Sequence, residues 1–249
     1  MNLHRRLAAT YAQIWRTYWG WASSILLLAV IVFVPIGLLS ALTLNVELDA
    51  LNITNGIKLA ALALAVGAVT LTGLLGEVFF SGAIAVSLTH PHGEDPPPLR
   101  EIARRLNYGR LIAVDLIFVA IVGLGLLLVF VPGVLAYVWL GLAGPVVELE
   151  DRTALGALRR SLALVRGNFW LVFLVLVPIE LVGDAIGAGL ATLVHDLFGH
   201  TFLATWLAES LADAALSPVF AVAAVLLTVE LMREKDGEAP PVRLSPVPA

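Results

Sequence analysis

The chain has no cysteine, only two lysines and few charged residues of any kind. Without cysteine it offers no disulfide, no thiolate metal site and no cysteine nucleophile. Charged residues make up 14% of its 249 residues and hydrophobic residues 59%, whereas a soluble domain carries about 25% charged residues. One soluble domain of this size does not bury so much apolar surface. The composition therefore predicts a membrane protein, in which lipid covers the outer faces.

Motifs that mark common catalytic and metal centres are also missing. The sequence has no phosphate-binding glycine loop, no nucleophile elbow and no H-E-x-x-H helix. The histidine-containing stretches HPHGED (90–95) and HDLFGH (195–200) match no zinc spacing. We therefore predict a protein that is not an enzyme and that has no metal site, no other cofactor and no nucleic-acid partner.

Long hydrophobic runs, in contrast, are abundant. A bilayer core of about 30 Å requires roughly 20 apolar residues in a helix. Six runs meet this requirement: 22–44, 59–87, 111–130, 133–149, 168–192 and 207–231. The sequence thus predicts an all-α fold, a polytopic integral membrane protein with six transmembrane helices. Only Val131-Pro132-Gly133 separates the third run from the fourth, and proline followed by glycine favours a reversal of the chain there.

The positions of the basic residues predict the orientation. With six spans and the N-terminus inside, fourteen of the fifteen basic residues lie in cytoplasmic segments, as the positive-inside rule requires. One long bent helix through Pro132 would place two four-arginine segments on opposite sides, so the hairpin is favoured. We expect a multi-pass protein of the bacterial cytoplasmic (inner) membrane with both termini cytoplasmic. A cleaved signal peptide is the alternative for the first run, which is longer than a usual signal sequence.

The same pattern suggests how the chain is divided. Basic stretches beginning at Arg5, Arg104 and Arg159 each lead into an apolar run. They indicate either three parallel two-helix repeats (1–87, 88–150 and 151–235) or positive-inside selection alone. We predict a basic, aromatic amphipathic lead helix at 1–21, a six-helix membrane domain at 22–235, and a proline-rich, disordered tail at 236–249.

The stretch from 145 to 170, PVVELEDRTALGALRRSLALVRGNFW, predicts an amphipathic helix on the cytoplasmic surface. Asp151 or Thr153 is suited to cap its start, and Gly167 to end it. Four apolar side chains share one helical face and are expected in the acyl boundary: Leu155, Leu158, Leu162 and Val165.

Arginines follow one edge of that face, and their long side chains are suited to reach lipid phosphates. The candidate headgroup residues are Arg152, Arg159, Arg160 and Arg166, together with Arg104 and Arg105 before the third run. Two interpretations stay open. The arginines either recognise anionic lipid headgroups or only anchor and orient the chain, since each basic residue at an anionic surface contributes about 1 kcal/mol without any specific site.

These residues also carry a resemblance. The sequence from Pro132-Gly133 through Pro145, Glu150 and ALRRS (157–161) to Arg166-Gly167 resembles the membrane domain named after glycerophosphoryl diester phosphodiesterase, found in many bacterial polytopic proteins. The specific part covers about residues 130–172, and the six-span layout extends it loosely to 20–232. In some members of that family the domain accompanies a soluble phosphodiesterase domain. This chain leaves no residues for one beyond its six spans, so the resemblance implies membrane organisation or transport rather than hydrolysis.

Carboxylates within the predicted spans need a physical explanation, because an ionised group at the bilayer centre costs about 2.5 kcal/mol or more. Glu180 and Asp184 share one face of the fifth span with Gly183 and Gly187, a small-residue pair that lets another helix approach. The sixth span carries Glu209 and Asp213. These four carboxylates either converge on a proton or cation site or on a polar path for a substrate, or Glu209 and Asp213 lie in the outer headgroup layer, while Glu180 lies deepest from either end. A further three, Glu77, Asp115 and Glu148, are expected to pair with cytoplasmic arginines.

Two functions remain open on this basis. The first is a membrane-organising or accessory protein that contacts anionic lipids, partner membrane proteins or a second copy of itself. The alternative is a small transporter or ion-coupled permease built around the intramembrane carboxylates.

Overall fold

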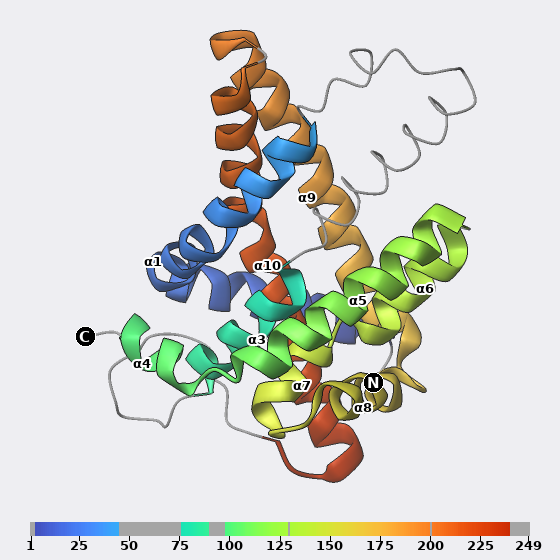
Figure 1. The fold of residues 1–249 in the computed structure, drawn as a ribbon. Coiled ribbons are helices and arrows are strands. Elements are labelled where there is room, and N and C mark those ends of the chain that lie inside the picture. Colours follow the sequence, from blue (N-terminus) through green and yellow to red (C-terminus); the bar gives the residue numbers. More distant parts are fainter. Residues whose placement is uncertain (1–2, 45–75, 90–97, 129, 200, 240–249) are drawn as a thin grey trace.

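The computed structural model describes residues 3–44, 76–89, 98–128, 130–199 and 201–239, and this part of the chain contains helices and no strands (Figure 1). The helices are α1 (Leu3–Leu44), α3 (Glu77–Leu88), α4 (Leu99–Arg105), α5 (Tyr108–Leu128), α6 (Phe130–Leu140), α7 (Ala143–Leu149), α8 (Ala154–Val165), α9 (Phe169–Phe198) and α10 (Phe202–Asp236). The predicted all-α class is confirmed. The proline-rich tail lies outside the described residues from position 240 onward.

Five helical segments are long and apolar enough to cross a membrane: Leu3–Leu38, Tyr108–Leu128, Phe130–Leu149, Phe169–Phe198 and Phe202–Asp236. They cover five of the six predicted runs. The remaining run, 59–87, lies outside the described residues up to position 75, and its described end is α3. The prediction of one uninterrupted helix there is wrong, because Gly76 has a left-handed backbone (φ 90°) and α3 starts at the next residue.

Helices α5 and α6 form the predicted hairpin, but its turn lies elsewhere. Because α6 begins at Phe130, Pro132 and Gly133 belong to its first turn, where a missing amide hydrogen breaks no helical bond. The two helices touch through glycine: a Cβ on Gly125 would lie 2.8 Å from the Cα of Gly133. Glycine therefore allows the two backbones to approach each other here.

The fourth predicted run is also interrupted. A turn at Gly141 and Leu142 separates α6 from α7, and α7 then packs tightly on α3. A Cβ on Gly144 would lie only 2.0 Å from the carbonyl oxygen of Val78. The chain is thus not helical at two buried places, at Gly76 before α3 and at Gly141 and Leu142 before α7. The two short helices that follow these places pack against each other.

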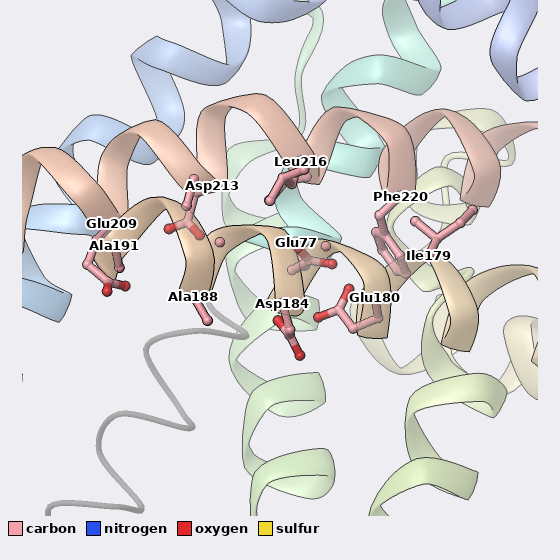
Figure 2. A pocket seen from close by; sticks show the side chains of 14 residues that line it. Glu77, Ile179, Glu180, Asp184, Ala188, Ala191, Glu209, Asp213, Leu216 and Phe220 are labelled. Atoms are coloured by element: carbon pink, nitrogen blue, oxygen red, sulfur yellow. The ribbon is translucent and has the colours of Figure 1, made fainter. Parts of the chain in front are cut away.

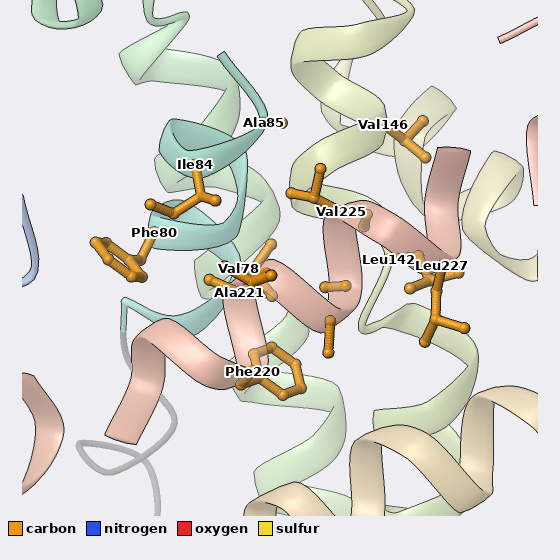
Figure 3. Close-up of a cluster of buried hydrophobic side chains, with 14 of the residues drawn as sticks. Val78, Phe80, Ile84, Ala85, Leu142, Val146, Phe220, Ala221, Val225 and Leu227 are labelled. Atoms are coloured by element: carbon orange, nitrogen blue, oxygen red, sulfur yellow. The ribbon is translucent and has the colours of Figure 1, made fainter. Parts of the chain in front are cut away.

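Helix α10 forms the centre of the bundle. It contacts α1, α3, α7, α8 and α9. In its apolar 18-residue stretch, 78% of the residues are buried inside the protein. Figure 3 shows its side chains among those of α3 and α7, with Val78 beside Ala221 and Leu142 beside Leu227. The residues from Phe220 to Val225 are at most 1% exposed. This packing fixes the position of α3, which contributes to the site described below.

Helix α1 corrects the prediction of a separate lead helix. It runs without a break through residue 21 and past Gly20 into the apolar segment. Its N-terminal half packs against α9 and α10, and the hydroxyl of Tyr11 donates to the carbonyl oxygen of Leu174 at 2.7 Å. That carbonyl lies four residues before Pro178, which has no amide hydrogen to offer it. Tyr11 thus replaces the missing helical bond.

The basic segments lie together at one end of the bundle. Arg6 of α1 donates to Glu230 at 2.9 Å and Glu234 at 2.8 Å, near the end of α10. Arg160 of α8 pairs with Asp236, and Arg110 of α5 with Asp151. In Figure 1, α4, α7, α8 and the C-terminal end of α10 occupy the lower part of the molecule, opposite the connection between α9 and α10.

Helix α8 has the predicted cap and the predicted end. The hydroxyl of Thr153 accepts a hydrogen bond from the amide of Gly156, and Gly167 has the positive φ of 94° that ends the helix. The predicted lipid contact of its apolar face is partly wrong. Leu158 and Val165 are buried against the protein, and Leu155 is exposed. The face packs on α5, α6, α7 and α10, which periodicity alone does not distinguish from lipid.

Candidate functional site

An acidic pocket lies between α9 and α10, with a cavity of about 290 Å³. Its lining includes five carboxylates: Glu77 of α3, Glu180 and Asp184 of α9, and Glu209 and Asp213 of α10. Among the described residues, no lysine or arginine lines it. In Figure 2 the five side chains follow the groove between the two long helices, with Glu209 at one end and Glu180 near the other. A volume of this size holds several water molecules.

The four carboxylates predicted from the sequence all line this one pocket. Each pair lies four residues apart on its helix, so both members face the same side. The surroundings differ in exposure: Asp184 is exposed, and Glu180, Glu209 and Asp213 are half-buried. The pocket therefore has an open side at Asp184 and a deeper end toward Glu180.

Glu180 is fixed by an aromatic side chain from α6. The hydroxyl of Tyr137 donates to a carboxylate oxygen of Glu180 at 2.9 Å. Tyr137 is only 6% exposed, and its ring packs between those of Phe118 and Phe220 at centroid distances of 5.8 and 5.6 Å. The hydroxyl is thus held in place by ring packing, and it bridges α6 to the pocket.

Glu77 closes the deep end of the pocket. It is the first residue of α3 and is 5% exposed, and its carboxylate interacts electrostatically with those of Glu180 and Asp213. One of its two oxygens, Oε2, has no hydrogen-bond partner within the described part of the chain. The expected ion pair between Glu77 and a cytoplasmic arginine is wrong. The position of Glu77 depends on where α3 packs, which no local sequence pattern predicts.

The break before α3 is stabilised by a second buried carboxylate. Asp115 of α5 accepts hydrogen bonds from the backbone amides of Gly76, Val78 and Phe79 at 2.8, 3.1 and 3.3 Å. A helix start leaves such amides without partners, and a carboxylate satisfies them. The expected pairing of Asp115 with an arginine is therefore also wrong. Asp115 holds the first turn of α3, and with it Glu77, in place.

The small residues of α9 have unequal roles. A Cβ on Gly187 would meet the Cβ of Ala212 at 3.4 Å, so this glycine lies at the contact with α10. A Cβ on Gly183 would meet only Leu216, at 3.8 Å. Gly183 thus leaves space that belongs to the pocket, which it lines together with Leu216.

The predicted headgroup arginines lie far from this pocket, at the basic end. Arg160 pairs with Glu150 at 2.8 Å and with Asp236, and Arg152 pairs with Glu150. Burial lowers the pKa of the Arg160 guanidinium, but the bonds to these two carboxylates outweigh burial and raise that pKa above its ordinary value. Arg105 pairs with Glu101. In contrast, Arg104, Arg159 and Arg166 are exposed, and no ion pair among the described residues involves them.

A compact metal centre is not formed by these carboxylates. Among the described residues, no three histidine, cysteine, aspartate or glutamate side chains lie close enough together to hold one metal ion. The pocket is a row of carboxylates along a groove, which suits protons, a hydrated cation or an extended cationic solute.

Comparison with known proteins gives one match. Residues 99–232 match the family model described as "Domain of unknown function (DUF7847)". No curated protein and no solved structure matches the chain. The matched range includes α4 to α9 and most of α10, and hence four of the five pocket carboxylates.

Proposed function

Because the chain belongs to the DUF7847 family, whose description assigns no activity, we propose its function from the geometry of the pocket: a small ion-coupled permease or transporter. In this proposal the row of carboxylates between α9 and α10 binds protons or a cationic solute within the membrane. The observation that carries it is the five carboxylates that line one cavity, with no lysine or arginine among its described lining residues.

The electrostatics of the pocket support this function. Carboxylates that face one another in a poorly hydrated place do not all stay ionised without a cation, a proton or water. Glu180 lies eleven residues from the start of α9, or roughly 16 Å along a helix that rises 1.5 Å per residue. That is about half the thickness of a bilayer core, where ionisable side chains typically belong to substrate or ion pathways.

The broken helices support it as well. Irregular backbone at membrane depth is tolerated where it is buried in protein or lines a cavity, and transporters place binding sites at such breaks. Here the non-helical residue Gly76 comes directly before Glu77, at the deep end of the cavity. The turn at Gly141 joins α6, which carries Tyr137, to α7, which packs on α3.

The test is flux through proteoliposomes. The purified protein is reconstituted with a pH-sensitive dye inside the vesicles, and a membrane potential is imposed in the presence of protons or of small organic cations. We expect flux from the natural protein, loss of it in Glu180→Gln and Asp213→Asn, and retention in Asp196→Asn. Asp196 is the matched control, because it is an exposed carboxylate of α9 outside the pocket. Unchanged flux in the first two variants would remove the pocket from the mechanism.

The proposed topology has six spans, with both termini on the cytoplasmic side of a bacterial inner membrane and with α8 at the membrane surface. The ion pairs that join α1, α8 and α10 at one end of the bundle support it, as does the positive-inside distribution. The chain has no cysteine, so single cysteines are specific labels. We expect Arg104→Cys and Arg159→Cys to react with a membrane-impermeant maleimide only after the cytoplasmic side is opened. Labelling of the two from opposite sides would refute this topology.

A second candidate function is membrane organisation through anionic lipids or partner helices. It is favoured by the exposure of Arg159 and Arg166 and of Trp15 and Trp19, which are 55% and 62% exposed. Amphipathic rings and arginines of this kind suit the headgroup layer. If this function is correct, Arg159→Gln combined with Arg166→Gln reduces the enrichment of anionic over zwitterionic lipid that copurifies with the protein. The resemblance to the phosphodiesterase-associated membrane domain stays a prediction.

A further inference from the structure

We propose that the ion bound by the acidic pocket is the proton and that Glu77 is the residue that carries it. This inference rests on the proposed function and specifies its coupling ion. It follows from the place of Glu77 in the fold, from the missing partner of one of its oxygens, and from the spacing of the surrounding carboxylates.

One oxygen of the buried Glu77 carboxylate is unsatisfied. Glu77 is 5% exposed, and Oε2 has no hydrogen-bond donor within the described part of the chain. A buried carboxylate without donors or a counter-ion is strongly disfavoured, whereas a carboxylic acid is neutral and needs only one acceptor for its proton. Ser217, which lies beside Glu77 and lines the same cavity, supplies a hydroxyl that accepts as well as donates. The neutral acid is the form that this environment accommodates.

Glu77 has no basic side chain as a counter-ion among the described residues that line its cavity. The titratable groups that interact with Glu77 are Glu180 from α9, Asp213 from α10, Tyr137 from α6 and Asp115 from α5, and Asp184 and Glu209 line the same cavity. Asp115 is occupied by three backbone amides and is not available as a donor. A metal ion needs several oxygens at close range, and no three histidine, cysteine, aspartate or glutamate side chains among the described residues form such a group. A proton requires only one carboxylate.

The carboxylates of the pocket connect its exposed side with Glu77. Asp184 is exposed at the open side of the pocket, Glu180 lies between it and the deep end, and Glu77 is buried there. Electrostatic interaction links Glu180 to both Asp184 and Glu77. The series leads from the exposed side of the pocket to a buried carboxylate on α3. A proton that enters at Asp184 passes through the cavity and binds a carboxylate oxygen of Glu77. It leaves when that O–H bond breaks.

Tyr137 has a positioning role in this series. Its hydroxyl donates to Glu180 at 2.9 Å and thereby stabilises the ionised form of that carboxylate. Glu180 is thus held in place beside Asp184 and Glu77, with which it interacts electrostatically. Tyr137→Phe is expected to leave Glu77 protonated and to shift the pH profile of proton flux, which a purely structural role would not do.

The experiment is infrared spectroscopy of the full chain in lipid nanodiscs at neutral pH. Protonated carboxylic acids absorb in a separate C=O region, at the highest frequency when they are poorly hydrated. We expect such a band in the natural protein, its loss in Glu77→Gln, and its retention in Asp196→Asn, which changes an exposed carboxylate of α9 outside the pocket. Glu77→Gln has nearly the shape of the neutral acid, so it is expected to fold. Its thermal unfolding is recorded in parallel.

The outcomes separate this inference from the proposed function. Absence of the band from the natural protein, or its persistence in Glu77→Gln, would show that Glu77 is ionised and would overturn the inference. Calorimetry with sodium, potassium and magnesium salts gives a second readout: saturable binding that Glu77→Gln abolishes would assign a metal ion to the pocket, and the permease function would stand without the proton. If flux in proteoliposomes is insensitive to Glu180 and Asp213 while the infrared band is present, the proton site stands and the permease function falls.

Discussion

Replacement of Gly144 by alanine is expected to disrupt the contact that supports Glu77. Gly144 of α7 lies against the backbone of α3, where an added Cβ would be 2.0 Å from the carbonyl oxygen of Val78 and 2.5 Å from Oγ of Ser81. Ordinary contact is about 3.5 Å, so the two helices must separate by roughly 1.5 Å. The obstructing atom on Val78 is backbone, which has no alternative rotamer. Residue 78 adjoins Glu77, so the deep end of the pocket shifts with it.

The cost can be worked out from these contacts. Overpacking a close helix contact costs about 1–3 kcal/mol, and the gain from replacing glycine in a helix by alanine is at most about 1 kcal/mol. We expect a net loss of about 1–2 kcal/mol, which corresponds to a decrease in Tm of about 2–8 °C for a domain of this size. The assay is thermal unfolding of the purified protein in detergent, followed by tryptophan fluorescence and by the fraction that stays monodisperse.

The matched control is Gly189→Ala in α9. Gly189 is also helical, but an added Cβ there meets no atom within 4 Å. We expect this variant to unfold at or slightly above the temperature of the natural protein. If Gly144→Ala were as stable as Gly189→Ala, the close contact between α3 and α7 would not exist in the folded protein, and the account of how Glu77 is positioned would fail with it.

Two further predictions concern polar groups that complete broken helices. Asp115→Ala removes the acceptor of three buried amides and is expected to lower the free energy of unfolding by about 2–3 kcal/mol, measured by denaturant titration in micelles. Asp115→Asn keeps one oxygen and is expected to lose less stability. Equal losses in the two variants would contradict the capping role of Asp115. Tyr11→Phe leaves the carbonyl of Leu174 without a donor and is expected to cost about 1 kcal/mol. In a Pro178→Ala background, residue 178 again has an amide hydrogen for the carbonyl of Leu174, and Tyr11→Phe is expected to cost nearly nothing. An equal cost in both backgrounds would show that the Tyr11 hydroxyl does not replace the missing amide.

Local signals in the sequence were sufficient for much of the architecture. Runs of apolar residues located five helical segments with the length to span a bilayer, and Thr153 and Gly167 marked the two ends of α8. The spacing of Glu180 with Asp184 and of Glu209 with Asp213 predicted carboxylates that face one another from neighbouring helices. In each case the deciding physics lies within a few residues, in helical period or cap geometry.

Other features depend on contacts between distant segments, and sequence patterns did not predict them. Glu77 was expected near arginines, because its neighbours read as part of one continuous helix. Its place in the pocket follows from the break at Gly76, which Asp115 makes possible from another helix. The continuity of α1 and the burial of Leu158 and Val165 depend in the same way on tertiary packing, which overrides the local pattern.

The central position of α10 has a consequence for how the protein is made. This helix is translated after α1, α3, α7, α8 and α9, yet it contacts all of them. In its apolar 18-residue stretch, 78% of the residues are buried. The earlier segments therefore enter the bilayer before their common partner exists, with the faces that they will turn toward it covered by lipid or by one another. Assembly of the bundle is thus a late event in biosynthesis. Ribosome stalling before position 202 is expected to yield an inserted but loosely associated set of helices, vulnerable to membrane proteases until α10 arrives.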